Sequence, residues 1–142
     1  MSAALVALLH HLAAFTLVAA LVAEHLLFVR RLEPEAARRL QVVDAVYGLS
    51  AGVLLVAGLL RVFYFEKGAQ YYFGNTWFLV KFGLFVLVAL LSIYPTVAFA
   101  SWRKRPGVTE AQARWVPRLL RAQLLLIPVI LFCAILMAKG FR

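Results

Sequence analysis

The sequence contains little charge and almost no cysteine, and each shortage excludes a class of protein. Only 15% of the 142 residues are charged and 65% are hydrophobic, which is wrong for a soluble domain and typical of a chain that lies in a bilayer. The one cysteine, Cys133, lies in an apolar run, so no internal disulfide can form. No basic region precedes the first apolar run, and Arg30 and Arg31 follow it, which reverses the order of a signal peptide. We therefore expect this run to be retained as a helix.

Four long apolar runs make up most of the chain. Each reaches the ~20 residues that a helix needs to cross the hydrocarbon core of a bilayer. The sequence therefore predicts an all-α fold, a polytopic integral membrane four-helix bundle, with one domain over residues 1–142 and little left for a soluble domain. The four expected helices cover approximately residues 3–29, 41–65, 75–101 and 115–138.

The basic residues predict how the bundle is oriented. Most of them lie in the connections 30–40 and 102–121, whereas the middle connection and its approach hold only Arg61 and Lys67. The positive-inside rule places the two basic connections in the cytoplasm and both termini outside. In a bacterium the membrane would be the cytoplasmic (inner) membrane. The net charge of +9 is split between two short loops, so we expect contact with anionic lipid head groups and no nucleic-acid partner.

Four ionisable residues are expected at similar depth in the outer part of the bundle. His10 and His11 lie in the first helix, Arg61 near the outer end of the second, and Lys81 about two turns into the third. Ionisable side chains in lipid are costly and by default mark a site. The histidines bring no negative charge to the two cations, and a porphyrin propionate, a quinone head group or a lipid phosphate would supply it. Alternatively, Arg61 and Lys81 extend to the interface.

The histidines restrict any haem or metal site. His10, His11 and His25 all lie on the first helix, whereas the two axial ligands of one haem approach the macrocycle from opposite faces. A haem here needs a second ligand of another type, a homodimer that supplies a histidine in trans, or an open position. The same shortage of converging ligands argues against a zinc or copper site.

An inner polar cluster is expected nearer the cytoplasmic end. It contains Glu24 and His25 of the first helix, Asp44 of the second, and Arg121 of the fourth. We expect Arg118, Arg121 or His25 to neutralise the two carboxyls, which would give a buried polar clamp between the helices.

A small-residue stripe runs along the second helix. Asp44, Gly48 and Gly52 are four residues apart and share one helix face. Such a stripe permits close helix contact in lipid. Alternatively, Gly48 and Gly52 make room for a flat cofactor.

A resemblance narrows these alternatives. The first-helix histidines, the short basic turn, the glycines of the second helix, and "WFLVK" at 77–81 running into "FGLFVLVALLSIYP" resemble HemJ-type protoporphyrinogen oxidase and the CopD-like membrane domain. The whole chain is similar to an uncharacterised bacterial family of four-helix membrane proteins near them.

The HemJ-type resemblance implies haem b and the removal of electrons and protons from protoporphyrinogen, with a first-helix histidine and a third-helix lysine as essential residues. By position these are His10 or His11, and Lys81. The chain departs from that pattern in its histidine doublet and in residues 92–94, "SIY", where the family tends to place another histidine.

Three hypotheses follow. In the first, the protein is a haem b or porphyrin redox protein in which His11 or His10 ligates iron, Lys81 and Arg61 hold propionates, His10 and Lys81 act in catalysis, and electrons pass to quinone or a partner. In the second, it is a non-enzymatic membrane subunit or CopD-like metal-transport accessory with the histidines as transient ligands. In the third, both polar layers only hold the helices together.

Overall fold

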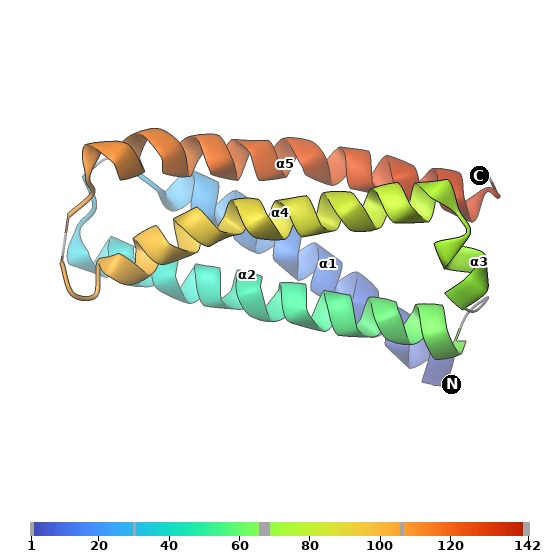
Figure 1. Ribbon diagram of the computed structural model, residues 1–142. Helices are drawn as coiled ribbons and strands as arrows, with labels where there is room; N and C mark the ends of the chain where they lie inside the picture. Colours follow the sequence, from blue (N-terminus) through green and yellow to red (C-terminus); the bar gives the residue numbers. More distant parts are fainter. Residues whose placement is uncertain (1, 30, 66–68, 106, 141–142) are drawn as a thin grey trace.

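The chain forms a bundle of four long helices in a computed structural model that describes residues 2–29, 31–65, 69–105 and 107–140 (Figure 1). Within these ranges every regular element is helical, and all four long helices are long and apolar enough to cross a membrane. The prediction of an all-α four-helix membrane protein is confirmed. The elements are α1 (Ser2–Leu27), α2 (Pro34–Leu60), the π-helical turn η1 (Arg61–Phe65), α3 (Ala69–Phe73), α4 (Thr76–Ser101) and α5 (Glu110–Ala138).

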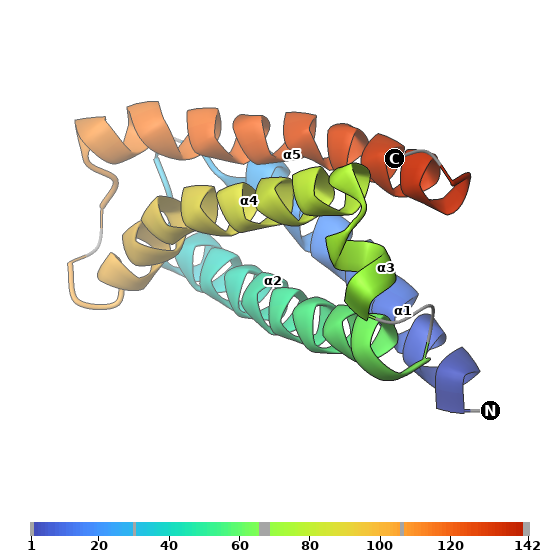
Figure 2. The same cartoon turned by 45° about the vertical axis from the view of Figure 1, so that its right-hand side comes forward.

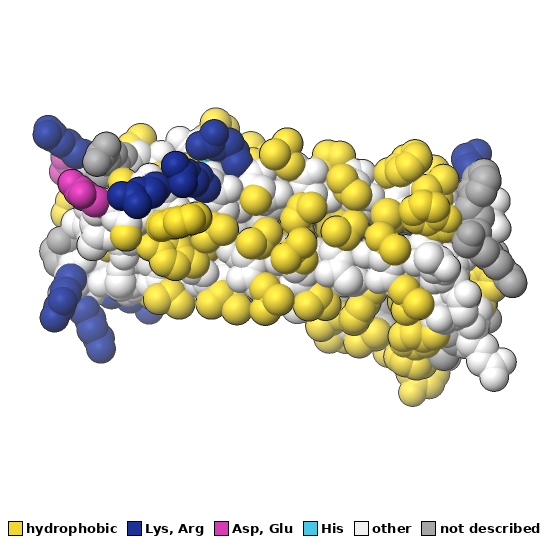
Figure 3. Space-filling model, turned by 45° about the horizontal axis from the view of Figure 1, so that its top comes forward, with side chains coloured by type: hydrophobic (Ala, Val, Ile, Leu, Met, Phe, Trp, Pro, Cys, Tyr) yellow, Lys and Arg dark blue, Asp and Glu magenta, His cyan; other side chains and the backbone are white. Residues whose placement is uncertain are grey.

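The long helices pair as two hairpins, α1 with α2 and α4 with α5. Both termini and the short α3 lie at one end of the bundle, which we call the terminus end (Figures 1 and 2). The connections α1–α2 and α4–α5 lie at the opposite end, which we call the loop end. Lysines and arginines gather at the loop end, next to a wide apolar surface (Figure 3). This separation is the charge asymmetry from which the orientation was predicted; of the residues used there, Arg30 and Lys67 lie outside the described residues.

Local capping sets the helix starts and explains where the predicted bounds differ. Helix α2 begins at Pro34, because proline fits the first turn of a helix and Glu33 precedes it in an extended conformation. Helix α5 begins at Glu110 rather than at residue 115, because Thr109 and Gln112 form a reciprocal capping box with two contacts of 3.1 Å. The aromatic segment 63–78, between the second and third apolar runs, contains the short helix α3.

Asn75 begins α4. Its side-chain Oδ1 accepts hydrogen bonds from the backbone N–H groups of Trp77 at 2.9 Å and Phe78 at 3.3 Å. This cap fixes the first turn of α4 and therefore the direction of the side chains that follow it, including Lys81.

The tightly packed core lies toward the loop end. Leu21, Leu40 and Leu120 are fully buried there, and the Trp102 indole N–H donates to Gln112 Oε1 at 3.0 Å. Elsewhere large apolar side chains face outward, as Phe15 does with 75% of its surface exposed. Such exposure would be costly in water and is the normal condition of a lipid-facing helix.

Candidate functional site

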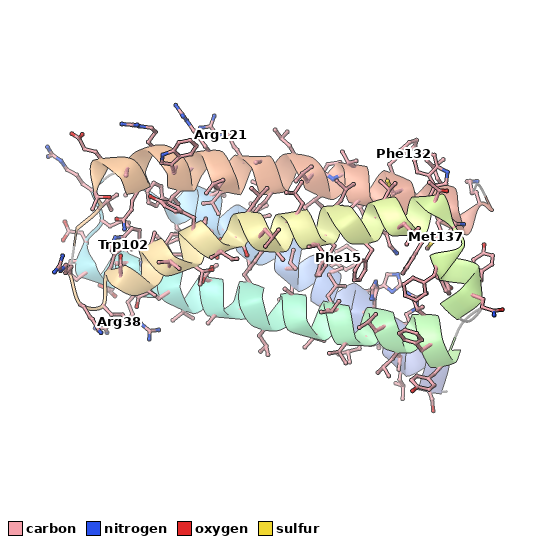
Figure 4. All side chains as sticks on the ribbon, in the orientation of Figure 1. Phe15, Arg38, Trp102, Arg121, Phe132 and Met137 are labelled. Carbon is pink, nitrogen blue, oxygen red and sulfur yellow. The ribbon has the colours of Figure 1, made fainter. Side chains whose placement is uncertain are left out.

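The terminus end contains a largely apolar pocket with a cationic rim. Its cavity of about 240 Å³ is lined by His10 of α1, Arg61 of η1 and Lys81 of α4. Tyr72 of α3 and Met137 of α5 complete the wall on the side of the C-terminal hairpin, and Figure 4 shows Met137 near the terminus end of α5. The structure thus brings together His10, Arg61 and Lys81, which the sequence placed at one depth.

His10 directs a ring nitrogen into a confined space. Its Nδ1 is buried and has no hydrogen-bond partner. The neighbouring position on α2 is Gly58, where an added Cβ would lie 3.4 Å from His10 Cε1 and 3.5 Å from Nδ1. The absence of a side chain at Gly58 therefore keeps open the space beside this nitrogen.

Lys81 enters the pocket from the first turns of α4. Its Nζ lies 5.3 Å from the centroid of the Phe78 ring, a cation–π distance. Phe78 is 4% exposed and packs against the rings of Tyr72 and Phe82. Lys81 forms no ion pair with any carboxylate that the structure describes.

The other residues predicted for the cofactor lie outside this pocket. His11 is exposed, and its Nδ1 donates to the Ala7 carbonyl of its own helix at 2.6 Å. Gly48 and Gly52 are also exposed, and a Cβ added to either would meet nothing within 4 Å. The two glycines therefore make no close helix contact with the described residues and do not line the terminus-end pocket, although Gly48 lines a second cavity together with Asp44.

The second polar group, which we call the carboxyl cluster, consists of Glu24, Asp44, Tyr47, Thr96 and Gln123. Glu24 is only 2% exposed, and its Oε1 has no hydrogen-bond partner. The Asp44 carboxyl lies beside that of Glu24, close enough for a hydrogen bond if one of them carries a proton. The Thr96 hydroxyl donates to Asp44 Oδ1 at 3.1 Å. The Tyr47 hydroxyl donates to Oε1 of the fully buried Gln123 at 2.7 Å.

The arginines expected to neutralise the carboxyl cluster do not reach it. Arg121 is exposed on the outer side of α5 (Figure 4), and the Arg118 guanidinium lies 5.5 Å over the Trp115 ring. Neither Glu24 nor Asp44 forms an ion pair with a described basic residue. The depth of these arginines was predicted from the sequence, but their direction around α5 was not. The predicted arginine clamp is therefore absent from the described residues.

A second cavity, of about 270 Å³, opens beside the carboxyl cluster. Asp44 and Tyr47 of α2 line it together with Ser92 and Thr96 of α4, whereas Glu24 does not. Of the two carboxyls in the cluster, Asp44 is therefore the one that is in contact with this cavity.

The three histidines do not converge on one point of the bundle. His25 is half-buried with an unpartnered Nδ1, and it lies on α1 far along the helix from His10 and His11. Over the described ranges no group of three or more His, Cys, Asp and Glu side chains could hold a metal ion. His10 is thus the histidine that faces a cavity together with other polar residues.

Several contributors had no clear signal in the sequence. Gly58, Tyr72 and Met137 line the pocket, and the Tyr47–Gln123 pair spans two helices far apart in the chain. Only the rotation of each helix, which packing sets, reveals these residues.

Comparison with known proteins supplies a family. The family model described as a predicted membrane protein, DUF2214, matches residues 2–142. No curated protein and no solved structure matches the chain.

Proposed function

We propose, for a chain that belongs to the DUF2214 family of predicted membrane proteins, that the terminus-end pocket binds an anionic tetrapyrrole, a porphyrin or haem b. One observation carries the proposal. An imidazole with an unpartnered, buried Nδ1 lines the same largely apolar cavity as the cationic side chains of Lys81 and Arg61.

The polar lining fits carboxylate substituents. Lys81 presents N–H donors in a setting with low dielectric constant, where a charge-assisted hydrogen bond contributes about 1.5–3 kcal/mol. Porphyrin propionates match this requirement, as do the carboxylates of a porphyrinogen. The Tyr72 and Phe78 rings offer apolar surface to the body of the same ligand.

The size of the cavity favours partial enclosure. Its volume of about 240 Å³ lies just below the ~300–1,000 Å³ typical of small-molecule pockets, so it holds only part of a macrocycle. Leu55, Phe82 and Leu131 belong to its lining and are themselves partly exposed on the lipid-facing surface. The remainder of a tetrapyrrole would extend from the pocket into the surrounding hydrocarbon.

His10 is the residue suited to iron. Imidazole is a common axial ligand of haem, and His10 is the histidine that lines the pocket. Met137 of α5 lines the same pocket, and a thioether is an established partner of histidine in haem proteins. Met137 would then be the second iron ligand, because His10 is the one histidine of α1 that lines the pocket. When bound, haem b supplies one-electron redox chemistry.

The proposal extends from ligand binding to a redox reaction. Oxidation of a porphyrinogen, or electron exchange between haem and quinone, is supported by the resemblance of "WFLVK" at 77–81 to the HemJ-type pattern. In both reactions His10 and Lys81 are the residues placed to contact the ligand. The alternative of a metal-transport accessory gains no comparable support, because the described histidines do not converge.

The test is an absorption spectrum of the detergent-purified protein, expressed with haem available, in oxidised and dithionite-reduced forms. We expect a Soret band with reducible b-type features and about one haem per chain by pyridine haemochrome, lost in His10→Ala and retained in His11→Ala. A well-folded colourless protein that binds neither added haemin nor added protoporphyrin would contradict the proposal.

A further inference from the structure

The two carboxyls of the carboxyl cluster lie in a setting that cannot hold two negative charges. Glu24 is 2% exposed, Asp44 lies beside it, and neither forms an ion pair with a basic residue that the structure describes. Like charges at such range in a medium of low dielectric constant repel strongly, and the fully buried Glu24 also loses its hydration. A positive ligand is therefore required at this position.

The groups that face the pair come from all four long helices. On α1 the neighbour in sequence is His25, and on α2 Tyr47 lies within electrostatic range of both carboxyls. Helix α4 supplies the Thr96 hydroxyl, and α5 supplies Gln123 to Tyr47. None of the Lys, Arg and His side chains that the structure describes forms an ion pair with either carboxyl.

The hydrogen bonds indicate which carboxyl holds the positive ligand. Asp44 Oδ1 already accepts a hydrogen bond from the Thr96 hydroxyl. Glu24 receives no such donor, and its Oε1 is buried without a partner. A protonated Glu24 can donate its O–H to Asp44, which gives each carboxyl a partner.

We infer that Glu24 and Asp44 form a proton-binding site within the membrane, in which Glu24 holds the proton and Asp44 exchanges it with the cavity between α2 and α4. The cavity of about 270 Å³ reaches Asp44, Ser92 and Thr96 but not Glu24. Of the two carboxyls, Asp44 is therefore the one that can exchange a proton with the cavity. Binding transfers one proton from a hydronium ion in the cavity through Asp44 to Glu24, so one O–H bond forms for each that breaks, and the hydronium ion leaves as water. This inference is independent of the ligand at the terminus end.

The test uses infrared spectroscopy of the full chain in lipid nanodiscs at neutral pH. We expect the carbonyl stretch of a protonated carboxylic acid, shifted to lower frequency in D₂O, and its loss in Glu24→Gln, whose amide still donates to Asp44. Glu35→Gln is the matched control, because Glu35 is exposed and pairs with Arg39 at 3.3 Å, and it should leave the band unchanged.

Two further measurements test the site: the band frequency in Asp44→Asn and the sodium dependence of the melting temperature. If Glu24→Gln does not fold, Asp44→Asn should shift the frequency of the band, because it replaces the group that faces Glu24; an unshifted band would overturn the inference. No acid band in the wild-type protein would also overturn it. A sodium-dependent rise in melting temperature together with loss of the band would overturn it in favour of a sodium site.

Discussion

The terminus end and the loop half of this bundle bury polar groups of opposite kinds. The terminus-end pocket presents an imidazole and the cations Lys81 and Arg61, and the carboxyl cluster presents Glu24 and Asp44 without a basic partner among the described residues. The two sets lie at different depths along α1. The polar residues therefore do not neutralise one another across the bundle.

Packing differs between the same two regions. The continuous hydrophobic core, with Phe99, Trp102 and Val116, lies at the loop end, whereas the terminus end has a cavity walled by aromatic rings. A tightly packed region holds its side chains in one arrangement, and a cavity leaves room for a ligand. The terminus end therefore has room for a ligand, whereas the hydrophobic core at the loop end does not.

Loss of the imidazole should have the largest effect on the terminus end. In His10→Ala we expect haem affinity to fall by more than about 100-fold, because removal of an iron ligand costs more than the ~10–100-fold of an outer-shell change. Haemin titration followed by absorbance measures it. His11→Ala is the control, since His11 is exposed and bonds to its own helix. Equal loss in the two variants would remove the distinction between the histidines.

Loss of the lysine charge should have the next largest effect. We expect Lys81→Ala to weaken protoporphyrin binding by about 10–100-fold, the equivalent of one charge-assisted hydrogen bond. Fluorescence titration measures the change, and Lys81→Arg should recover part of it. Lys139→Ala, a change of an exposed lysine just after α5, should leave the affinity unaltered. If both alanine variants bind like the wild type, Lys81 does not hold the ligand.

A substitution in the carboxyl cluster should lower the free energy of unfolding and leave porphyrin affinity unchanged. Tyr47→Phe removes the donor of the 2.7 Å bond to Gln123 and leaves a buried amide oxygen without its partner. We expect a loss of about 0.5–2 kcal/mol in unfolding free energy, measured by denaturant titration in detergent, with unchanged porphyrin affinity. Tyr94→Phe, at a tyrosine that is 38% exposed, should cost less than about 0.5 kcal/mol. A fall in porphyrin affinity on Tyr47→Phe would show that the two regions are coupled.

The smallest effect is expected from a matched pair of glycine substitutions. In Gly58→Ala the new methyl would lie 3.5 Å from His10 Nδ1, at ordinary contact distance, and would narrow the space beside that nitrogen. We expect about 2–10-fold weaker porphyrin binding with little change in stability, equivalent to roughly 0.4–1.4 kcal/mol. Gly52→Ala should change neither, because nothing lies within 4 Å of its Cβ position. Titration of both variants decides whether Gly58 limits access to His10.

The sequence predicted the four helices because the length of an apolar run is enough to identify a membrane span. Their bounds required local chemistry. The polar first turns of α5 depend on the Thr109–Gln112 capping box, which lies before the apolar run itself. Residues 63–78 contain too few apolar residues in period to predict α3.

The sequence predicted how deep in the bundle each site residue lies, but not the face of its helix on which it lies. Adjacent residues on a helix differ by about 100°, so the doublet alone could not tell that His10 faces the pocket and His11 does not. Gly58 lies six residues after Gly52, about 240° further around α2, and for this reason it meets His10 while the stripe does not. Arg121 likewise lies at the expected depth, but it is exposed on the side of α5 that faces away from Glu24.

The most direct test of the account compares two forms of one ligand. Protoporphyrin and its dimethyl ester share an apolar macrocycle and differ in two negative charges, which the proposed site would bind through Lys81, a cation that lines the pocket. Fluorescence titration of the purified protein in nanodiscs should show the diacid binding at least about tenfold more tightly, with the difference reduced in Lys81→Ala. Equal affinities for the two forms, or no saturable binding of either, would contradict the account.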